Sequence, residues 1–182
     1  IMVNSGSSAN LLAINSLGLK PGSEIITPAL TFSTTVAPIV QLGLVPAFVD
    51  VEPSTFVIDC GLIEEMITEN TKAMLIPNLI GNLPDWNRIK QLADKYSLIV
   101  MEDSADTIGY SFDGGNTGQI NDVVTSSFYA SHIVTGAGFG GIMCTNNEAF
   151  AESATIMRSW GRASSLRDES EEVDQRFNTK VD

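Results

Sequence analysis

A single histidine, His132, is the side chain in this sequence best suited to take and return a proton near neutral pH. It lies within the stretch SSFYASHIVTGAGFGG, residues 126–141, between an apolar run and a glycine-rich turn. A histidine in such a place can equally be a hydrogen-bonded structural side chain. The surrounding chain must therefore decide whether His132 acts as an acid or base.

A second candidate site lies near the start of the sequence, where NSGSSAN precedes the helical run LLAINSL. Gly6, Ser7 and Ser8 at a helix start would leave backbone N–H groups free at the positive end of the helix dipole, an arrangement that suits a phosphate group. Serine is also an ordinary helix cap. From these residues alone, both interpretations stay open.

Acidic and aromatic residues follow two other apolar runs. Glu102 and Asp103 come directly after SLIVM, and burying a carboxylate costs free energy unless it gains a partner. The protonated ring nitrogen of a cofactor would serve, and so would a nearby arginine in a structural salt bridge. Phe32 follows the run EIITPAL and could stack on a planar ring, although a phenylalanine there is more often part of the core.

Apolar β-rich runs alternate with helical patterns through most of the chain. This alternation, with strands that are apolar on both faces, predicts an α/β fold with a mostly parallel sheet sandwiched by helices. We expect strands at 24–28, 45–51, 73–77, 98–102, 123–129 and 141–145, and helices at 11–17, 33–42, 62–69, 85–96 and 148–158. Ligands of such sheets bind outside the carboxyl ends of the strands, so the candidate residues should meet there.

Composition limits the function classes. The 182 residues are 43% hydrophobic, enough for one domain with a sizeable core, and the net charge of −12 disfavours binding to nucleic acid or to acidic membrane surfaces. We expect a cytoplasmic protein, since no apolar run is long enough to cross a membrane and no signal peptide is evident. Cys60 and Cys144 have no second cysteine or histidine at metal spacing, so we expect buried, reduced thiols and no metal site. Both ends look cut, which suggests a fragment.

The glycines after His132 match a dinucleotide-binding pattern, because Gly136, Gly138 and Gly141 fit G-x-G-x-x-G after a strand. That pattern requires a helix next, whereas the residues that follow, IMCT, predict another strand. We therefore interpret the glycines as a turn between two strands.

Several motifs together resemble one family. NSGSSANLL, PALTFSTT, VDVEPSTFVID, NLIGN, EDSADTIG and SSFYASHIVTGAGFGG stand in the order and rough spacing of the DegT and StrS group of sugar-modifying enzymes, which use pyridoxal phosphate (PLP) and have the aspartate-aminotransferase fold. The resemblance implies that residues 1–162 form the large, cofactor-binding domain of PLP fold type I. Residues 163–182 would then lead to a C-terminal domain.

The resemblance also implies roles for individual residues. Gly6, Ser7, Ser8 and Ser127 match contacts to the cofactor phosphate, and Phe32 matches the aromatic residue that stacks on the pyridine ring. Asp103 matches the carboxylate that keeps the pyridine nitrogen protonated, so that the ring can accept electrons. Asp106 is a further cofactor-site residue, at a position where aminotransferases usually carry a neutral side chain.

His132 stands where aminotransferases of the family carry the lysine that bonds covalently to the aldehyde cofactor. The same exchange marks the nucleotide-sugar 3-dehydratases, which bind pyridoxamine phosphate (PMP) non-covalently, and SSFYASHI, NLIGN and Asp106 are similar to the GDP-4-keto-6-deoxymannose 3-dehydratase pattern. The resemblance implies that His132 acts as the base in removing the carbon-3 hydroxyl of a 4-keto-6-deoxy sugar.

The expected partners are a nucleotide-linked 4-keto sugar, glutamate as the amino donor, and a second copy of the chain in a homodimer. Ala163, Ser164, Ser165 and Leu166 follow the Trp-Gly-Arg segment where iron–sulphur relatives carry cysteines, which argues against a bound cluster. Two alternatives remain: a nucleotide-sugar aminotransferase that works without the usual lysine, and a catalytically silent, cofactor-binding regulatory protein.

Overall fold

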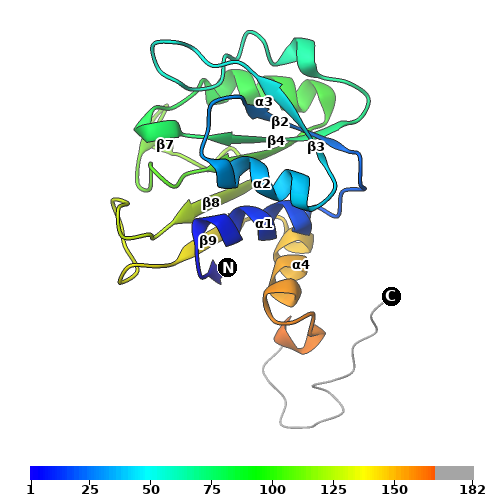
Figure 1. Ribbon diagram of the computed structural model, residues 1–182, viewed down its shortest axis with the longest axis vertical. Coiled ribbons are helices and arrows are strands. Elements are labelled where there is room, and N and C mark those ends of the chain that lie inside the picture. The colour runs from blue at the N-terminus through cyan, green and yellow to red at the C-terminus, as the bar shows by residue number, and fades with distance from the viewer. Residues whose placement is uncertain (167–182) are drawn as a thin grey trace.

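The computed structural model describes residues 1–166, and it has the α/β architecture that the sequence predicts (Figure 1). A seven-stranded sheet has the order β1-β9-β8-β5-β4-β2-β3, in which β8, β5, β4, β2 and β3 pair in parallel and β9 and β1 pair antiparallel. The strands are β1 (Met2–Val3), β2 (Glu24–Pro28), β3 (Val45–Val49), β4 (Thr71–Pro77), β5 (Ile99–Asp103), β8 (Val123–Ser127) and β9 (Gly141–Thr145), with a separate hairpin of β6 (Ser111–Phe112) and β7 (Gly115–Asn116).

Helices cover both faces of the sheet. They are α1 (Gly6–Ser16), α2 (Ser33–Gln41), α3 (Trp86–Tyr96) and α4 (Glu148–Arg158), with short 3₁₀ segments η1 (Glu64–Met66), η2 (Leu79–Gly81) and η3 (Ala163–Leu166). One apolar cluster joins α1, α2 and α4 to one face, and a second joins α3 to the other.

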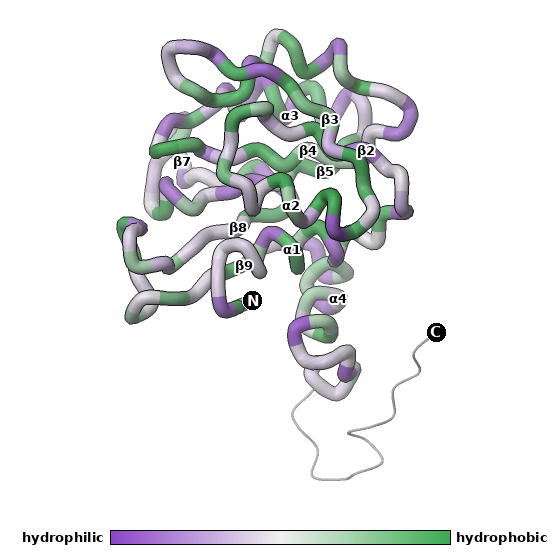
Figure 2. The backbone as a smooth tube through the Cα atoms, viewed as in Figure 1, coloured by the Kyte–Doolittle hydropathy of each residue, from purple (hydrophilic) through white to green (hydrophobic). Residues whose placement is uncertain are grey.

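Successive residues of the central strands supply the two clusters in turn. Ala73 and Leu75 of β4 pack into the first, whereas Met74 and Ile76 pack into the second, and all four side chains are fully buried. This division follows from the period of two in a strand, and it explains why these strands read as continuous apolar runs. Figure 2 shows β4 and β5 as hydrophobic segments through the middle of the molecule.

The expected helix at 62–69 is wrong. Only η1, a single 3₁₀ turn, forms there, and Ile67 is already extended. Threonine side chains take over the hydrogen bonds that would continue a helix, because Thr71 Oγ1 accepts from the Thr68 N–H at 2.9 Å and Thr68 Oγ1 accepts from the Asn70 N–H at 3.1 Å. In addition, few residues of this segment precede the start of β4, and nucleating so short a helix is unfavourable.

The expected helix at 11–17 begins earlier than predicted. Ser5 caps α1 by accepting a hydrogen bond from the Ser8 N–H at 3.1 Å, so Gly6, Ser7 and Ser8 form the first helical turn. The first N–H groups of a helix have no partner within it. The remaining expected strands and helices are confirmed to within a few residues at each end.

Other expectations have mixed outcomes. Cys60 and Cys144 are both free thiols. Cys60 is partly buried, and its burial raises the thiol pKa to about 11. The expectation of a buried Cys144 is wrong, because that residue is exposed. No helix within residues 1–166 is long and apolar enough to span a bilayer. Most of the segment 163–182 lies outside the described residues.

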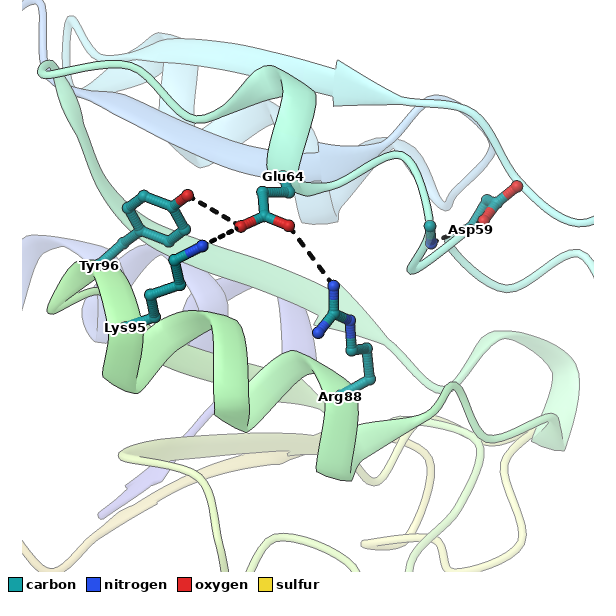
Figure 3. Close-up of polar contacts among 6 residues, drawn as sticks. Asp59, Glu64, Arg88, Lys95 and Tyr96 are labelled. Carbon is teal, nitrogen blue, oxygen red and sulfur yellow. Dashed lines mark hydrogen bonds and ion pairs between the residues drawn. The ribbon is translucent and has the colours of Figure 1, made fainter.

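Glu64 of η1 anchors this segment to α3 (Figure 3). Its carboxylate accepts from Lys95 Nζ at 2.6 Å and from the Tyr96 hydroxyl at 2.8 Å, and it lies 3.5 Å from Arg88 Nη2. The hydrogen bonds from Lys95 and then Tyr96 hold the Glu64 pKa below its ordinary value of 4.5. The cluster is solvent-exposed, so its stabilising effect should be small and sensitive to salt.

We expect Glu64→Gln to lower the melting temperature slightly at neutral pH. Because the carboxyl pKa is lowered in the folded state, its contribution is complete above pH 4.5 and disappears as the pH falls through the folded-state pKa. Melting temperatures of the wild type and the variant should therefore converge in acid and in high salt. Glu65→Gln removes a neighbouring charge and leaves the Lys95 contact intact, so an equal loss in that control would contradict the assignment.

Candidate active site

His132 lies in the long connection between β8 and β9, which turns the chain from one antiparallel strand to the next. Two hydrogen bonds close this connection next to the strand ends. The Phe128 N–H donates to the Gly140 carbonyl at 2.9 Å, and the Gly136 N–H donates to the Phe128 carbonyl at 3.0 Å. Gly138 and Gly140 have φ of 106° and 133°, which favours glycine. A strand follows, so the interpretation of the glycines as a turn is confirmed.

Asp106 lies against the imidazole of His132. Nδ1 of His132 is 3.3 Å from Oδ1 of Asp106, and Oδ2 of Asp106 accepts a hydrogen bond from the Ile80 backbone N–H at 3.0 Å. The histidine side chain is 22% exposed, so it is held by protein on most sides but open to a ligand. A carboxylate beside Nδ1 favours the proton on that nitrogen and leaves Nε2 free to accept another.

A small open pocket of about 270 Å³ surrounds this pair. Asp106, Ser131 and His132 supply its polar groups, and Ile80, Tyr110 and Ile133 supply apolar ones. Ile80 and Ile133 are largely exposed, at 66% and 64%. Polar groups that converge among apolar side chains are typical of a ligand site.

Asp103 ends β5 with its carboxylate among neutral donors. Oδ2 accepts from Asn10 Nδ2 at 2.8 Å and from the Thr35 hydroxyl at 3.1 Å, and Oδ1 accepts from the Ala105 N–H at 3.2 Å. Desolvation by the surrounding protein raises the pKa of this carboxyl, although these hydrogen bonds oppose the shift. The described contacts thus leave Asp103 suited to a cationic partner.

Gly6 meets Ser127 where α1 begins beside the end of β8, and Ser7 and Ser8 follow Gly6 in the first helical turn. A Cβ atom added to Gly6 would lie 2.7 Å from Cβ of Ser127, so only glycine allows this close approach. Ser127 is 8% exposed, and its Oγ accepts from the Tyr129 N–H at 3.3 Å. The Ser8 N–H is used by the Ser5 cap, so the N–H groups of Gly6 and Ser7, together with the serine hydroxyls, are the groups that suit an anion.

Phe32 stands apart from these contacts. It precedes the first residue of α2, and its side chain is 68% exposed. The expectation that a phenylalanine at this junction is more often core does not hold. An exposed aromatic ring at the carboxyl edge of the sheet is free to cover a planar ligand.

Asn10 and Thr35 are residues that the sequence reasoning missed. Asn10 is 2% exposed on α1, and its Oδ1 accepts from the Thr125 hydroxyl at 2.5 Å while its amide reaches Asp103. Thr35 is 1% exposed on α2. The sequence signal that could have identified them is a polar residue on the buried face of an apolar helix, because a buried polar group needs a hydrogen-bond partner.

The comparisons with known proteins agree with the motifs. The sequence profile of the DegT/DnrJ/EryC1/StrS aminotransferase family matches residues 1–182. The chain belongs to this family. The family is PLP-dependent. One similar solved structure is NtdA from Bacillus subtilis with bound cofactor PMP, which superposes with a TM-score of 0.85 at 34% identity, and the match covers 95% of this chain and 38% of that one.

Similar proteins have different activities. Lipopolysaccharide biosynthesis protein RfbH of Salmonella typhimurium is 41% identical over 170 residues, covering 89% of this chain and 39% of that protein. A dTDP-4-dehydro-2,6-dideoxy-D-glucose 3-dehydratase of Saccharopolyspora spinosa is 41% identical over 169 residues (88% and 36%), and the GDP-perosamine synthase of Caulobacter vibrioides is 34% identical over 161 residues (88% and 43%). The chain spans about two fifths of the length of these relatives.

A solved dehydratase has the same fold. A histidine-to-asparagine mutant of GDP-4-keto-6-deoxymannose-3-dehydratase with bound GDP-perosamine superposes with a TM-score of 0.90 at 31% identity, covering 98% of this chain and 50% of that one. The expected family and the expected PLP fold type I are therefore confirmed.

Proposed function

We propose that the protein carrying this chain is a PMP-dependent nucleotide-sugar 3-dehydratase of deoxysugar or surface-polysaccharide biosynthesis. The observation that carries this proposal is His132 beside Asp106, at the position where the resemblance places the lysine of the aminotransferases. A histidine cannot bond to the aldehyde cofactor as a lysine amine does, but it can move a proton.

Three groups of residues suit the parts of the cofactor. Gly6, Ser7, Ser8 and Ser127 would hold the phosphate, and the exposed ring of Phe32 would cover one face of the pyridine. Asp103 would pair with the ring nitrogen, because its desolvated carboxylate is contacted by neutral donors and gains most from a cation. Bound PMP would supply an amine for the 4-keto group of the sugar and a ring that accepts electrons.

His132 would then serve as the general base. Asp106 keeps the Nδ1 proton in place, so the lone pair of Nε2 is the one available to take a proton from the cofactor carbon next to the amine. Asp103 would favour the protonated ring, and the side chains of Ile80 and Ile133 would line the site beside the base.

We extend the proposal to the rest of the protein. Residues 1–162 would form the large domain, and the active enzyme would be a homodimer that uses glutamate to renew PMP. An aminotransferase is the second candidate, because the similar GDP-perosamine synthase is named for making an amino sugar. In that case, His132 would still transfer the proton, but an amino sugar would leave the site.

Product analysis separates these functions. The intact protein would be incubated with PMP, glutamate and a 4-keto-6-deoxy sugar linked to GDP, CDP or dTDP, and the products would be identified by mass spectrometry. Loss of the carbon-3 hydroxyl from one of these sugars supports the dehydratase. An amino sugar that keeps this hydroxyl supports the aminotransferase, and unchanged sugars with all three nucleotides would rule out both.

A further inference from the structure

The NLIGN segment, residues 78–82, supplies the backbone group that holds Asp106. The N–H of Ile80 donates to Asp106 Oδ2 at 3.0 Å, while Oδ1 of the same carboxylate lies 3.3 Å from His132. Asp106 therefore connects the η2 turn to the imidazole. The turn thus positions the carboxylate that lies against His132.

The turn has an unusual backbone. Ile80 has φ of 50° and ψ of 30°, a left-handed conformation that is rare for a β-branched residue, and Gly81 follows with φ of 87°. The Ile80 side chain is 66% exposed, so burial of that side chain does not explain the strained conformation. Strain of this kind persists only where the surrounding structure imposes it.

Asn78 provides that constraint. It is 1% exposed, and its amide donates to Glu102 Oε1 at 2.7 Å and to the Thr107 hydroxyl at 2.8 Å, while its Oδ1 accepts from Trp86 Nε1 at 3.0 Å. The Asn78 N–H donates to the Asp103 carbonyl at 3.0 Å, which ties it to the end of β5. Its own carbonyl accepts from the Gly81 N–H at 3.4 Å and closes the turn.

Asparagine is the side chain that fits this place. The buried site offers acceptors on one side and the indole donor of Trp86 on the other, and an amide has both donors and an acceptor. An apolar residue would leave the fully buried Glu102 without one of its donors, and an aspartate would place a second carboxylate beside it.

We propose that Asn78 is a positioning residue for His132, acting through the left-handed turn at Leu79–Gly81 and through Asp106. The hydrogen bonds of Asn78 hold the turn, and the turn sets the position of the Ile80 N–H group. This N–H group orients the Asp106 carboxylate, which in turn favours the imidazole tautomer with the proton on Nδ1. The effect on turnover rests on the proposed function, whereas the effect on the tautomer does not.

The test compares Asn78→Ala with Asn121→Ala. Each variant removes an amide that donates to the same buried carboxylate, since Asn121 Nδ2 donates to Glu102 Oε2 at 2.6 Å, but only Asn78 belongs to the turn. The tautomer of His132 is read from imidazole ¹⁵N shifts of the cofactor-free intact protein at alkaline pH, with the signal assigned by its loss in His132→Asn. We expect Asn78→Ala to reduce the Nδ1–H population and Asn121→Ala to leave it unchanged.

A second variant covers the case in which Asn78→Ala fails to fold. Gly81→Ala disturbs the turn from outside the buried network, because Gly81 has φ of 87° and an added Cβ would lie 3.3 Å from the Tyr110 hydroxyl. It should also reduce the Nδ1–H population, and kcat should fall by about tenfold to a hundredfold with KM near the wild-type value. An unchanged tautomer in Gly81→Ala, or an equal shift in Asn121→Ala, would overturn the proposal.

Discussion

Replacement of His132 by asparagine should abolish dehydration and leave cofactor binding intact. General acid–base catalysis typically contributes about 10²–10⁴-fold, and the asparagine amide cannot accept the proton that Nε2 of His132 would take. Gly6, Ser7, Ser8 and Ser127, which we propose hold the phosphate, lie on α1 and β8, and Asp103 lies on β5, so the substitution does not touch them. The measurement is kcat for loss of water, together with the affinity for PMP from its absorbance or fluorescence.

Asp106→Asn provides a comparison for this variant. It keeps a side chain able to accept the Ile80 N–H, but it removes the charge beside Nδ1 of His132. The loss of activity should therefore be smaller than in His132→Asn. A His132→Asn protein with activity within a few fold of the wild type would show that His132 is not the base.

The sequence predicted the sheet well because its central strands are buried on both faces. Such strands appear as continuous apolar runs, and their ends are marked by polar residues such as Asp103 and Ser127. The prediction of a helix at 62–69 failed because the side chains of Thr68 and Thr71 accept local backbone hydrogen bonds, which compete with helix formation. Those bonds depend on where β4 begins, which periodicity alone does not fix.

The part of the candidate site that could be predicted from the sequence consists of residues in motifs that directly follow strand ends. Asp103, Asp106 and His132 lie on segments that the parallel topology brings to one edge, so their grouping could be expected. The side chains of Asn10 and Thr35 that donate to Asp103 come from α1 and α2, and the bond from Asn78 to Glu102 joins the β4–α3 connection to β5, at sequence separations of 24 to 93 residues. Nothing local in the sequence marks such pairs, because each is formed only when the elements pack.

Asp103→Asn should produce the second large loss of activity. A neutral amide would no longer favour a protonated cofactor ring, and removing one electrostatic group of this kind costs about 10²–10³-fold. Cofactor affinity should also fall, since the described contacts to this partly buried carboxylate come from neutral donors. The measurement is turnover at saturating PMP beside the dissociation constant for PMP.

The same variant has a distinct effect on stability in the absence of cofactor. Burial raises the pKa of Asp103 above its ordinary value of 3.8, so the folded wild type loses stability as the pH rises through the folded-state pKa. Asp103→Asn lacks this loss, and its melting temperature relative to the wild type should therefore increase with pH. Asp113→Asn, at an exposed residue, should show no such trend, and a flat difference for Asp103→Asn would contradict the desolvated carboxylate.

The most direct test of the central claim is whether a lysine at position 132 captures the cofactor. His132→Lys places a primary amine where we propose that the base faces PLP, so PLP followed by borohydride should leave a permanent adduct on residue 132, detected by peptide mass spectrometry. The wild type under the same conditions should carry no adduct at this position. If His132→Lys binds PLP through its phosphate site but forms no adduct at residue 132, then His132 does not face the cofactor and the proposed mechanism is wrong.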